Sequence, residues 1–291
     1  MNPENTSQTN PQKKIDHLLK SASVEYKRSK QEIWDQLTEQ IGPRDQEVQV
    51  VLIQRNWRRI LLVAASVAFL LFMAGSSLMY TRTVHVDAGK TANVELPDGS
   101  IVQLNSASSI GYRPLGWYLK RSAFLSGEAF FEVTKGEKFE IRSSQGSTSV
   151  LGTSFNIYAR KDDYQVFCES GKVSVRASEK ELILSPGELA RVDHVRGLIK
   201  DEETRMEITL AWRLNKFIYN TTSLHKVFQD IERQYNVKIK SGISELDNYH
   251  YTGIFERSID AYSALEIVCH SFNFSLMAES DSTFVIIQNQ P

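Results

Sequence analysis

The sequence lacks the short motifs that mark common enzyme active sites and metal centres. It contains no HExxH or CxxC pair, no Gly-rich nucleotide loop of the Walker or GxGxxG type, and no GxSxG around a nucleophilic serine. Its 6 histidines are scattered, so each is expected to be a surface or core residue instead of a ligand. The sequence therefore predicts a protein that is not an enzyme and that holds no metal and no cofactor.

Cysteine and net charge are also scarce. The only two cysteines, Cys168 and Cys269, lie in what read as separate domains. We expect two unpaired buried thiols, although an oxidising compartment would permit a disulfide. The formal net charge of -1 at pH 7 gives no sign of a basic surface for nucleic acid. No direct nucleic-acid partner is therefore expected.

Charge is absent altogether from one long stretch, Ile60 to Tyr80, with the sequence ILLVAASVAFLLFMAGSSLMY. As a helix it would reach about 32 Å, close to the roughly 30 Å hydrocarbon core of a bilayer. A signal peptide would be shorter and nearer the N-terminus, so residues 60–80 are predicted to be a single transmembrane helix. Three arginines precede it and one follows directly: Arg55, Arg58 and Arg59, then Arg82. This excess predicts a cytoplasmic N-terminus and, in a Gram-negative cell, a periplasmic C-terminus on a single-pass inner-membrane protein.

Residues 1–59 are predicted to form a short cytoplasmic helical segment. Two amphipathic helical patterns occur in it, and in the second Ser29 and Glu32 have the spacing of a capping box, while Gly42-Pro43 ends the pattern. Two such helices bury too little surface to be stable alone, so we expect their apolar face to dock a partner. Packing on each other or on the membrane surface is the alternative. The predicted contact residues are Ile33, Trp34, Leu37 and Ile41.

Residues 84–195 follow a different pattern, in which apolar and polar residues alternate in short runs. Turn residues separate the runs at nearly regular intervals, among them Ser126-Gly127, Lys135-Gly136 and Ser170-Gly171. No stretch of helical period interrupts them. The sequence therefore predicts a mainly β domain, which could be a roll, a sandwich or a solenoid-like sheet.

Residues 207–288 give a mixed pattern. A strand is expected over Leu210 to Thr222, followed by a helix capped by Ser223, two strands, a helix over about Ala261 to Phe272, and a hairpin around Asp281-Ser282. The order is βαββαββ, which predicts a small α+β C-terminal domain.

Five blocks in the β region resemble the periplasmic domain of the FecR family in order and spacing. They are LPDGSIVQLNSASSIGY (96–112), GEAFFEV (127–133), VLGTSFNIYA (150–159), ESGKVSV (169–175) and LSPGELARV (184–192). The stretch AWRLNKFIYNTTSLHKVFQDIERQYNVKI (211–239) is similar to the C-terminal domain of family members, with Ser223 in place of a common proline.

The resemblance implies a transmembrane anti-sigma factor. Its N-terminal helices would bind an extracytoplasmic-function sigma factor, and its C-terminal domain would receive a signal from the signalling domain of a TonB-dependent outer-membrane transducer. Periplasmic and intramembrane proteases would then release the N-terminal part, which would regulate genes for glycan or iron uptake. The rival interpretation is a membrane-anchored periplasmic scaffold or glycan-binding protein that binds no sigma factor.

The resemblance further implies a bond that can cleave itself, because some family members break between the glycine and the threonine of the VLGT block. The matching residues are Gly152 and Thr153. The Thr153 hydroxyl would attack the preceding carbonyl carbon in an N-to-O acyl shift. The alternative is that Gly152 is a bulge or turn and Thr153 an ordinary strand residue.

Overall fold

The computed structural model describes residues 11–21, 27–42, 56–161, 163–193, 195–201 and 206–289. The chain divides into two compact units, Met1–Ile60 and Leu61–Pro291. The first unit contains helices α1 (Pro11–Ser21) and α2 (Lys30–Gln40). Both were predicted as helices, and the capping box at Ser29 is confirmed. Arg55, part of the predicted basic flank, lies outside the described residues.

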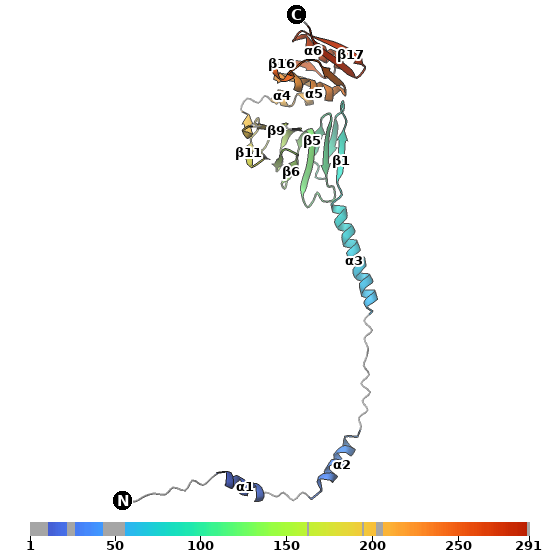
Figure 1. Cartoon of the computed structure of the whole chain (residues 1–291), viewed down its shortest axis with the longest axis vertical. Coiled ribbons are helices and arrows are strands. Elements are labelled where there is room, and N and C mark those ends of the chain that lie inside the picture. Colours follow the sequence, from blue (N-terminus) through green and yellow to red (C-terminus); the bar gives the residue numbers. More distant parts are fainter. Residues whose placement is uncertain are drawn as a thin grey trace, which may run out of the picture. The chain divides into compact units, whose positions relative to one another are not determined.

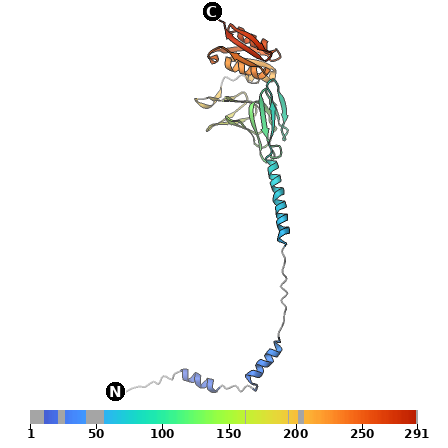
Figure 2. The same cartoon turned by 45° about the vertical axis from the view of Figure 1, so that its right-hand side comes forward.

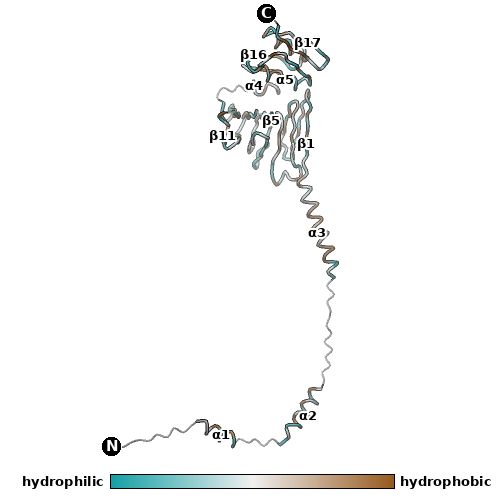
Figure 3. Tube along the Cα trace, in the orientation of Figure 1, coloured by the Kyte–Doolittle hydropathy of each residue, from teal (hydrophilic) through white to brown (hydrophobic). Residues whose placement is uncertain are grey.

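Helix α3 (Trp57–Leu78) contains most of the predicted transmembrane stretch. Its 22 residues would measure about 33 Å. Among the described residues it is the one helix long and apolar enough to cross a membrane. Hydrophobic residues make up most of its length (Figure 3). The chain thus fits a single-pass membrane protein.

The β domain begins directly after α3 (Figure 1). Its strands are β1 (Arg82–Val86), β2 (Ala92–Glu95), β3 (Ile101–Leu104), β4 (Ser108–Tyr112), β5 (Arg121–Glu132), β6 (Phe139–Arg142), β7 (Ser147–Val150), β8 (Ser154–Arg160), β9 (Asp163–Ser170), β10 (Val173–Ala177), β11 (Lys180–Leu184), β12 (Leu189–Asp193) and β13 (Gly197–Asp201). Nearly all neighbours are antiparallel, but β5 and β6 pair in parallel.

Strand β5 belongs to two half-sheets. Its first half pairs with β4 and β6, in the order β1-β4-β5-β6-β7-β10-β11, and its second half pairs with β3 and β8, in the order β2-β3-β5-β8-β9-β12-β13. Gly127, at φ +106°, marks the change. A β-carbon there would lie 2.7 Å from the Cα of Ser108, so only glycine lets the two strands meet. The predicted turn at Ser126-Gly127 is therefore a bend within one strand.

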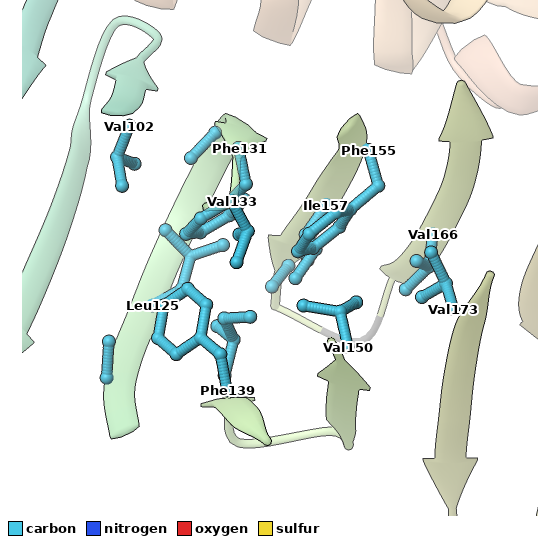
Figure 4. Close-up of a cluster of buried hydrophobic side chains, with 14 of the residues drawn as sticks. Val102, Leu125, Phe131, Val133, Phe139, Val150, Phe155, Ile157, Val166 and Val173 are labelled. Atoms are coloured by element: carbon cyan, nitrogen blue, oxygen red, sulfur yellow. The ribbon is translucent and has the colours of Figure 1, made fainter. Parts of the chain in front are cut away.

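One apolar core lies between the half-sheets. The rings of Phe131 and Phe155 stack at 5.0 Å, and Leu125 and Phe139 lie against them from the other half-sheet (Figure 4). At the far edges, Lys180 Nζ donates to the carbonyl of Arg196 over 2.6 Å. Inward-facing apolar residues on alternate positions explain this core, as their spacing predicted.

The C-terminal part confirms the predicted order βαββαββ. Its elements are β14 (Lys216–Ser223), α5 (Leu224–Tyr235), β15 (Lys238–Ser241), β16 (His250–Glu256), α6 (Ala261–His270), β17 (Phe274–Ser280) and β18 (Thr283–Gln288), with a 3-10 turn η2 (Leu246–Asn248) before β16. The strands form two small sheets: β14 with β16, and β15-β18-β17. Helices α5 and α6 pack their apolar faces into one core with residues of both sheets. Ser223 caps α5, because its side chain accepts a hydrogen bond from the Lys226 N–H.

The strand expected over Leu210 to Thr222 is wrong in its first part. A short helix α4 (Met206–Thr209) and a 3-10 turn η1 (Ala211–Leu214) precede β14. Asn215 then adopts a left-handed conformation at φ 56°, which ends the turn and starts the strand. The turn forms because its side chains contact the β domain, beside which the C-terminal part lies in both views (Figures 1 and 2).

Candidate functional site

The apolar face of α2 is the first candidate site. Trp34 is 58% exposed, Leu37 and Ile41 are exposed on the same side of the helix, and Ile33 is half-buried. At 3.6 residues per turn these four positions form one stripe. No residue of α2 is buried, so nothing among residues 11–21 and 27–42 of the first unit covers this stripe.

The N-terminal end of α2 holds the stripe in place. Ser29 Oγ accepts from the Glu32 N–H at 3.2 Å, while a Glu32 carboxylate oxygen accepts from the Ser29 N–H at 2.9 Å. Arg28 Nη1, before the helix, donates a hydrogen bond to Gln36 Oε1 at 3.0 Å, one helical turn after Glu32. A capping box satisfies two backbone donors and is worth about 1 kcal/mol to a helix. The stripe is therefore presented on a helix with a defined start.

The Gly152–Thr153 bond is the second candidate site. It lies in the connection between β7 and β8, where Gly152 has φ +150°. A β-carbon at residue 152 would lie 2.7 Å from the Cα of Lys135, and one at Gly171 would lie 3.2 Å from the Gly152 carbonyl oxygen. Backbone bonds fix both sides: the Thr153 carbonyl accepts from Val133 and the Leu151 carbonyl from Gly136, each at 2.9 Å.

The Thr153 hydroxyl is buried and has no partner. The residue is 6% exposed, and among the described residues no group hydrogen-bonds to its Oγ1. A buried polar atom without a partner costs about 1–3 kcal/mol, so such atoms are rare unless they have a role. The bond therefore joins a glycine, in a conformation that other residues rarely adopt, to an unengaged nucleophile.

The third candidate site is the seam between the β domain and the C-terminal part, and the sequence did not predict it. Trp212 and Arg213, on the turn η1, enter the β domain. Trp212 Nε1 donates to Asn156 Oδ1 at 3.2 Å, and the Trp212 ring packs beside Phe130 in a small apolar cluster. The Arg213 guanidinium lies 3.5 Å from the centre of the Phe130 ring and donates to Gln103 Oε1 at 2.9 Å.

A buried carboxylate organises the middle of the seam. Glu128 accepts from the side-chain amides of Asn105 at 2.8 Å and Asn156 at 3.1 Å. The Oδ1 atoms of the same two asparagines accept hydrogen bonds from the C-terminal part: Asn105 from Arg257, and Asn156 from Trp212. Burial raises the pKa of the Glu128 carboxyl. Burial also lowers the pKa of the neighbouring Arg160 guanidinium.

Further contacts surround a cavity of about 210 Å³ that both parts line. Lys226 pairs with Asp163 at 2.7 Å, and the Gly89 N–H donates to the Arg233 carbonyl at 2.8 Å. The seam is therefore polar and loosely filled, which is typical of domain contacts that can open. Among the described residues, no three His, Cys, Asp or Glu side chains gather as a metal site would require.

A sequence signal for the seam was faint. Trp212 and Arg213 stand next to each other in LAWRLNKF, where a strand would alternate, and that break in period was the available hint. Cys168 and Cys269 are both free and buried, as expected.

Comparisons with known proteins agree on the second unit. The family model described as FecR protein matches residues 82–174, and the model described as FecR, C-terminal matches residues 216–286. Two crystal structures of a proposed anti-sigma factor from Parabacteroides distasonis ATCC 8503 are similar, at 28% and 26% identity and a TM-score of 0.65 each. Each match covers 72% of this chain and the full length of the chain in the crystal structure. No curated protein sequence matches the chain.

Proposed function

The chain belongs to the FecR family, and we propose that it acts as a transmembrane anti-sigma factor that links a periplasmic signal to an extracytoplasmic-function sigma factor. The uncovered apolar stripe of α2 carries this proposal. Helix-in-groove docking uses anchors at this spacing, and Trp is among the residues that contribute most at interfaces. The sigma factor would cover Ile33, Trp34, Leu37 and Ile41.

The orientation follows from the flanks of α3. Arg58 and Arg59 stand at its start, whereas Arg82 is the first charged residue after its end. Under the positive-inside rule the first unit faces the cytoplasm and the β domain the periplasm, with α3 in the inner membrane. The stripe of α2 is then on the side where a sigma factor is found.

The C-terminal part is proposed to receive the signal. Among the described residues, β14 and β16 pair only with each other, and β15 and β17 pair only with β18, so each of these four strands keeps a free edge. A free edge can accept a strand from another protein. The expected partner is the signalling domain of a TonB-dependent outer-membrane transducer, whose cargo would be a glycan or an iron complex.

The seam offers a route from that partner to the β domain. Its polar contacts through Trp212, Arg213 and Glu128 hold the C-terminal part in place. A transducer that binds the undocked form better would shift the equilibrium by its difference in affinity for the two forms. Undocking would then expose the β domain to periplasmic proteases, and intramembrane proteases would release the first unit.

Sigma binding is tested by co-purification from the full-length chain in lipid nanodiscs. Replacing Trp34 and Leu37 by alanine should cost roughly 3 kcal/mol at such an interface, which is about a hundredfold in Kd. The matched control replaces Asp35 and Glu39, which face the other side of α2, by alanine and should retain binding. A wild-type chain that captures no sigma factor would contradict the proposal, as the scaffold or glycan-binding alternative predicts. Equal capture by both double variants would reject the stripe as the contact.

Self-cleavage at Gly152–Thr153 is proposed on the geometry of the bond. Thr153 Oγ1 would attack the Gly152 carbonyl carbon, the C–N bond would break, and the amine would take up a proton to leave an ester. Water would then hydrolyse the ester, giving a Gly152 carboxylate and the free Thr153 hydroxyl. The fragments, residues 1–152 and 153–291, would be roughly 17 and 16 kDa of the 33.1 kDa chain.

The matching test compares two substitutions in native membranes. Thr153→Val keeps the shape and removes only the unpartnered hydroxyl, so it should abolish both fragments and leave the fold as stable or more stable, by about 1 kcal/mol. Thr153→Ser keeps a hydroxyl and should still cleave. Fragments that persist in Thr153→Val, or a wild-type chain that stays intact, would contradict self-cleavage.

A further inference from the structure

The loop between β4 and β5, residues 113–120, exposes a cluster of large apolar side chains. Tyr118 is 80% exposed, Leu119 is 77% exposed and Leu115 is 56% exposed. Met79 and Tyr80, just after α3, are exposed as well. Single exposed apolar residues are ordinary on protein surfaces, but five within two adjoining segments form a patch.

This patch sits at the end of α3. Only residues 79–81 separate α3 from β1, and an extended chain of that length reaches about 11–14 Å. The register pairs Arg82, the first residue of β1, with Tyr112, the last residue of β4, so the 113–120 loop leaves the sheet where the helix enters it. The loop also touches the helix end: a β-carbon on Gly116 would lie 2.9 Å from the Leu78 carbonyl oxygen.

A buried tryptophan and two backbone hydrogen bonds hold the 113–120 loop in one conformation. Trp117 is buried between Tyr112 and Phe139, with ring centres 5.9 Å and 5.2 Å away. Inside the loop, the N–H groups of Leu119 and Lys120 both donate to the Gly116 carbonyl at 3.1 Å. The exposed side chains are therefore displayed by a fixed turn, and no rearrangement of the loop is needed to present them.

The flanks of the loop suit lipid headgroups. Arg113 and Lys120 bracket the apolar residues, and Arg113 Nη1 lies 3.6 Å from the Met79 sulfur. Tyrosine with neighbouring basic residues is the composition found at membrane–water interfaces, where the ring lies at headgroup level and the long cations reach outward.

We propose that the 113–120 loop inserts Leu115, Tyr118 and Leu119 into the interfacial layer of the bilayer that α3 crosses. The β domain is then attached to the membrane at two points, the helix and the loop, which fixes its tilt. Because Val150 pairs with Phe139, and Phe139 with Arg121, the Gly152–Thr153 connection also leaves the sheet on the membrane side. The proposal rests on α3 spanning the membrane and not on sigma binding.

Depth measurements on the full-length chain in phosphatidylethanolamine–phosphatidylglycerol nanodiscs test it. Tyr118→Cys and Leu119→Cys are labelled with an environment-sensitive fluorophore and quenched by nitroxide lipids and by aqueous iodide. Val67→Cys in α3 is the lipid control. Val195→Cys is the water control, since Val195 is 93% exposed. It lies near the C-terminal part and away from α3, because Asp193, two residues earlier, lines a surface hollow with His225 and Lys226. The wild-type chain is the labelling blank, since Cys168 and Cys269 are buried.

We expect headgroup and shallow-chain nitroxides to quench residues 118 and 119 several times more than residue 195, with iodide showing the reverse order. Iodide quenching at 118 and 119 equal to that at 195, with Val67 still in lipid, overturns the proposal and leaves the span intact. Labels shielded from both quenchers would mean that a second copy covers the patch, which also overturns it. Water exposure at residue 67 would remove the span and the loop contact together.

Discussion

Replacing Trp212 by alanine should loosen the C-terminal part from the β domain while leaving both folded. Trp212 is half-buried in the cluster with Phe130 and Phe167, and its Nε1 donates to Asn156. Full burial of a Trp is worth about 3–5 kcal/mol on truncation, so we assign roughly 2–3 kcal/mol to this half-buried ring and its hydrogen bond.

Hydrogen exchange at single amides measures this loss directly. The Gly89 N–H, in the β domain, donates to the Arg233 carbonyl of α5, so it is protected only while the seam is closed. A cost of 2–3 kcal/mol should speed its exchange by about 30- to 150-fold. The Phe131 amide, in the ladder between β5 and β8, reports the β domain itself and should keep its rate.

A conservative variant separates packing from hydrogen bonding. Trp212→Phe keeps an aromatic ring in the cluster and loses the bond to Asn156, so it should cost about 1 kcal/mol and accelerate Gly89 exchange about fivefold. Unchanged Gly89 exchange in Trp212→Ala would refute the reasoning, because the seam would then close without its largest side chain. Faster exchange at Phe131 as well would refute it too, since the damage would not be confined to the seam.

Two further predictions concern buried ionisable groups. Burial raises the pKa of Glu128 above its ordinary 4.5, so the folded chain binds this proton more tightly than the unfolded chain. Glu128 should therefore lower the free energy of unfolding of the wild-type chain, relative to that of Glu128→Gln, progressively as pH rises above 4.5; a difference that stays constant or grows in the opposite direction with pH contradicts the assignment. Burial also raises the pKa of the Cys168 thiol to about 11 and of the Cys269 thiol to about 12, so iodoacetamide at pH 8 should label neither until denaturant is added, and rapid labelling of the native chain would contradict this.

Local chemistry predicted the helix starts well. The caps at Ser29 and Ser223 each depend on residues within three positions, and both form as their spacing indicated. The long apolar run likewise predicted α3 to within three residues at its start. Such features are recognisable because the groups that bond are neighbours in sequence.

Long-range features escaped the same reasoning. Ser126-Gly127 has the composition of a turn, but the requirement for glycine at 127 comes from the backbone of Ser108 on another strand. The parallel pairing of β5 with β6 and the bond of Arg257 to Asn105 likewise join distant residues. Periodicity carries no information on which surfaces meet, so the seam and its buried Glu128 had no clear signal.

The candidate contact residues divide in the same way. Trp34, Leu37 and Ile41 were predicted from one helical period, and their exposure on α2 agrees with that pattern, whereas their proposed partner still rests on the family and on the tests above. The unpartnered Thr153 hydroxyl could not be predicted because its burial depends on distant residues: Gly171 lies against the Thr153 side chain, and Lys135 lies against Gly152.

The pairing of β1 with β4 has a mechanical consequence. Tension between α3 and the C-terminal part enters the β domain through β1, whose five residue pairs with β4 run from Arg82–Tyr112 at the α3 end to Val86–Ser108. They bear the tension together, in shear, and must break together. The seam at Trp212 and Arg213 is a small contact that can peel one bond at a time. A stretched molecule would therefore give way at the seam first, with its attachment to α3 still whole.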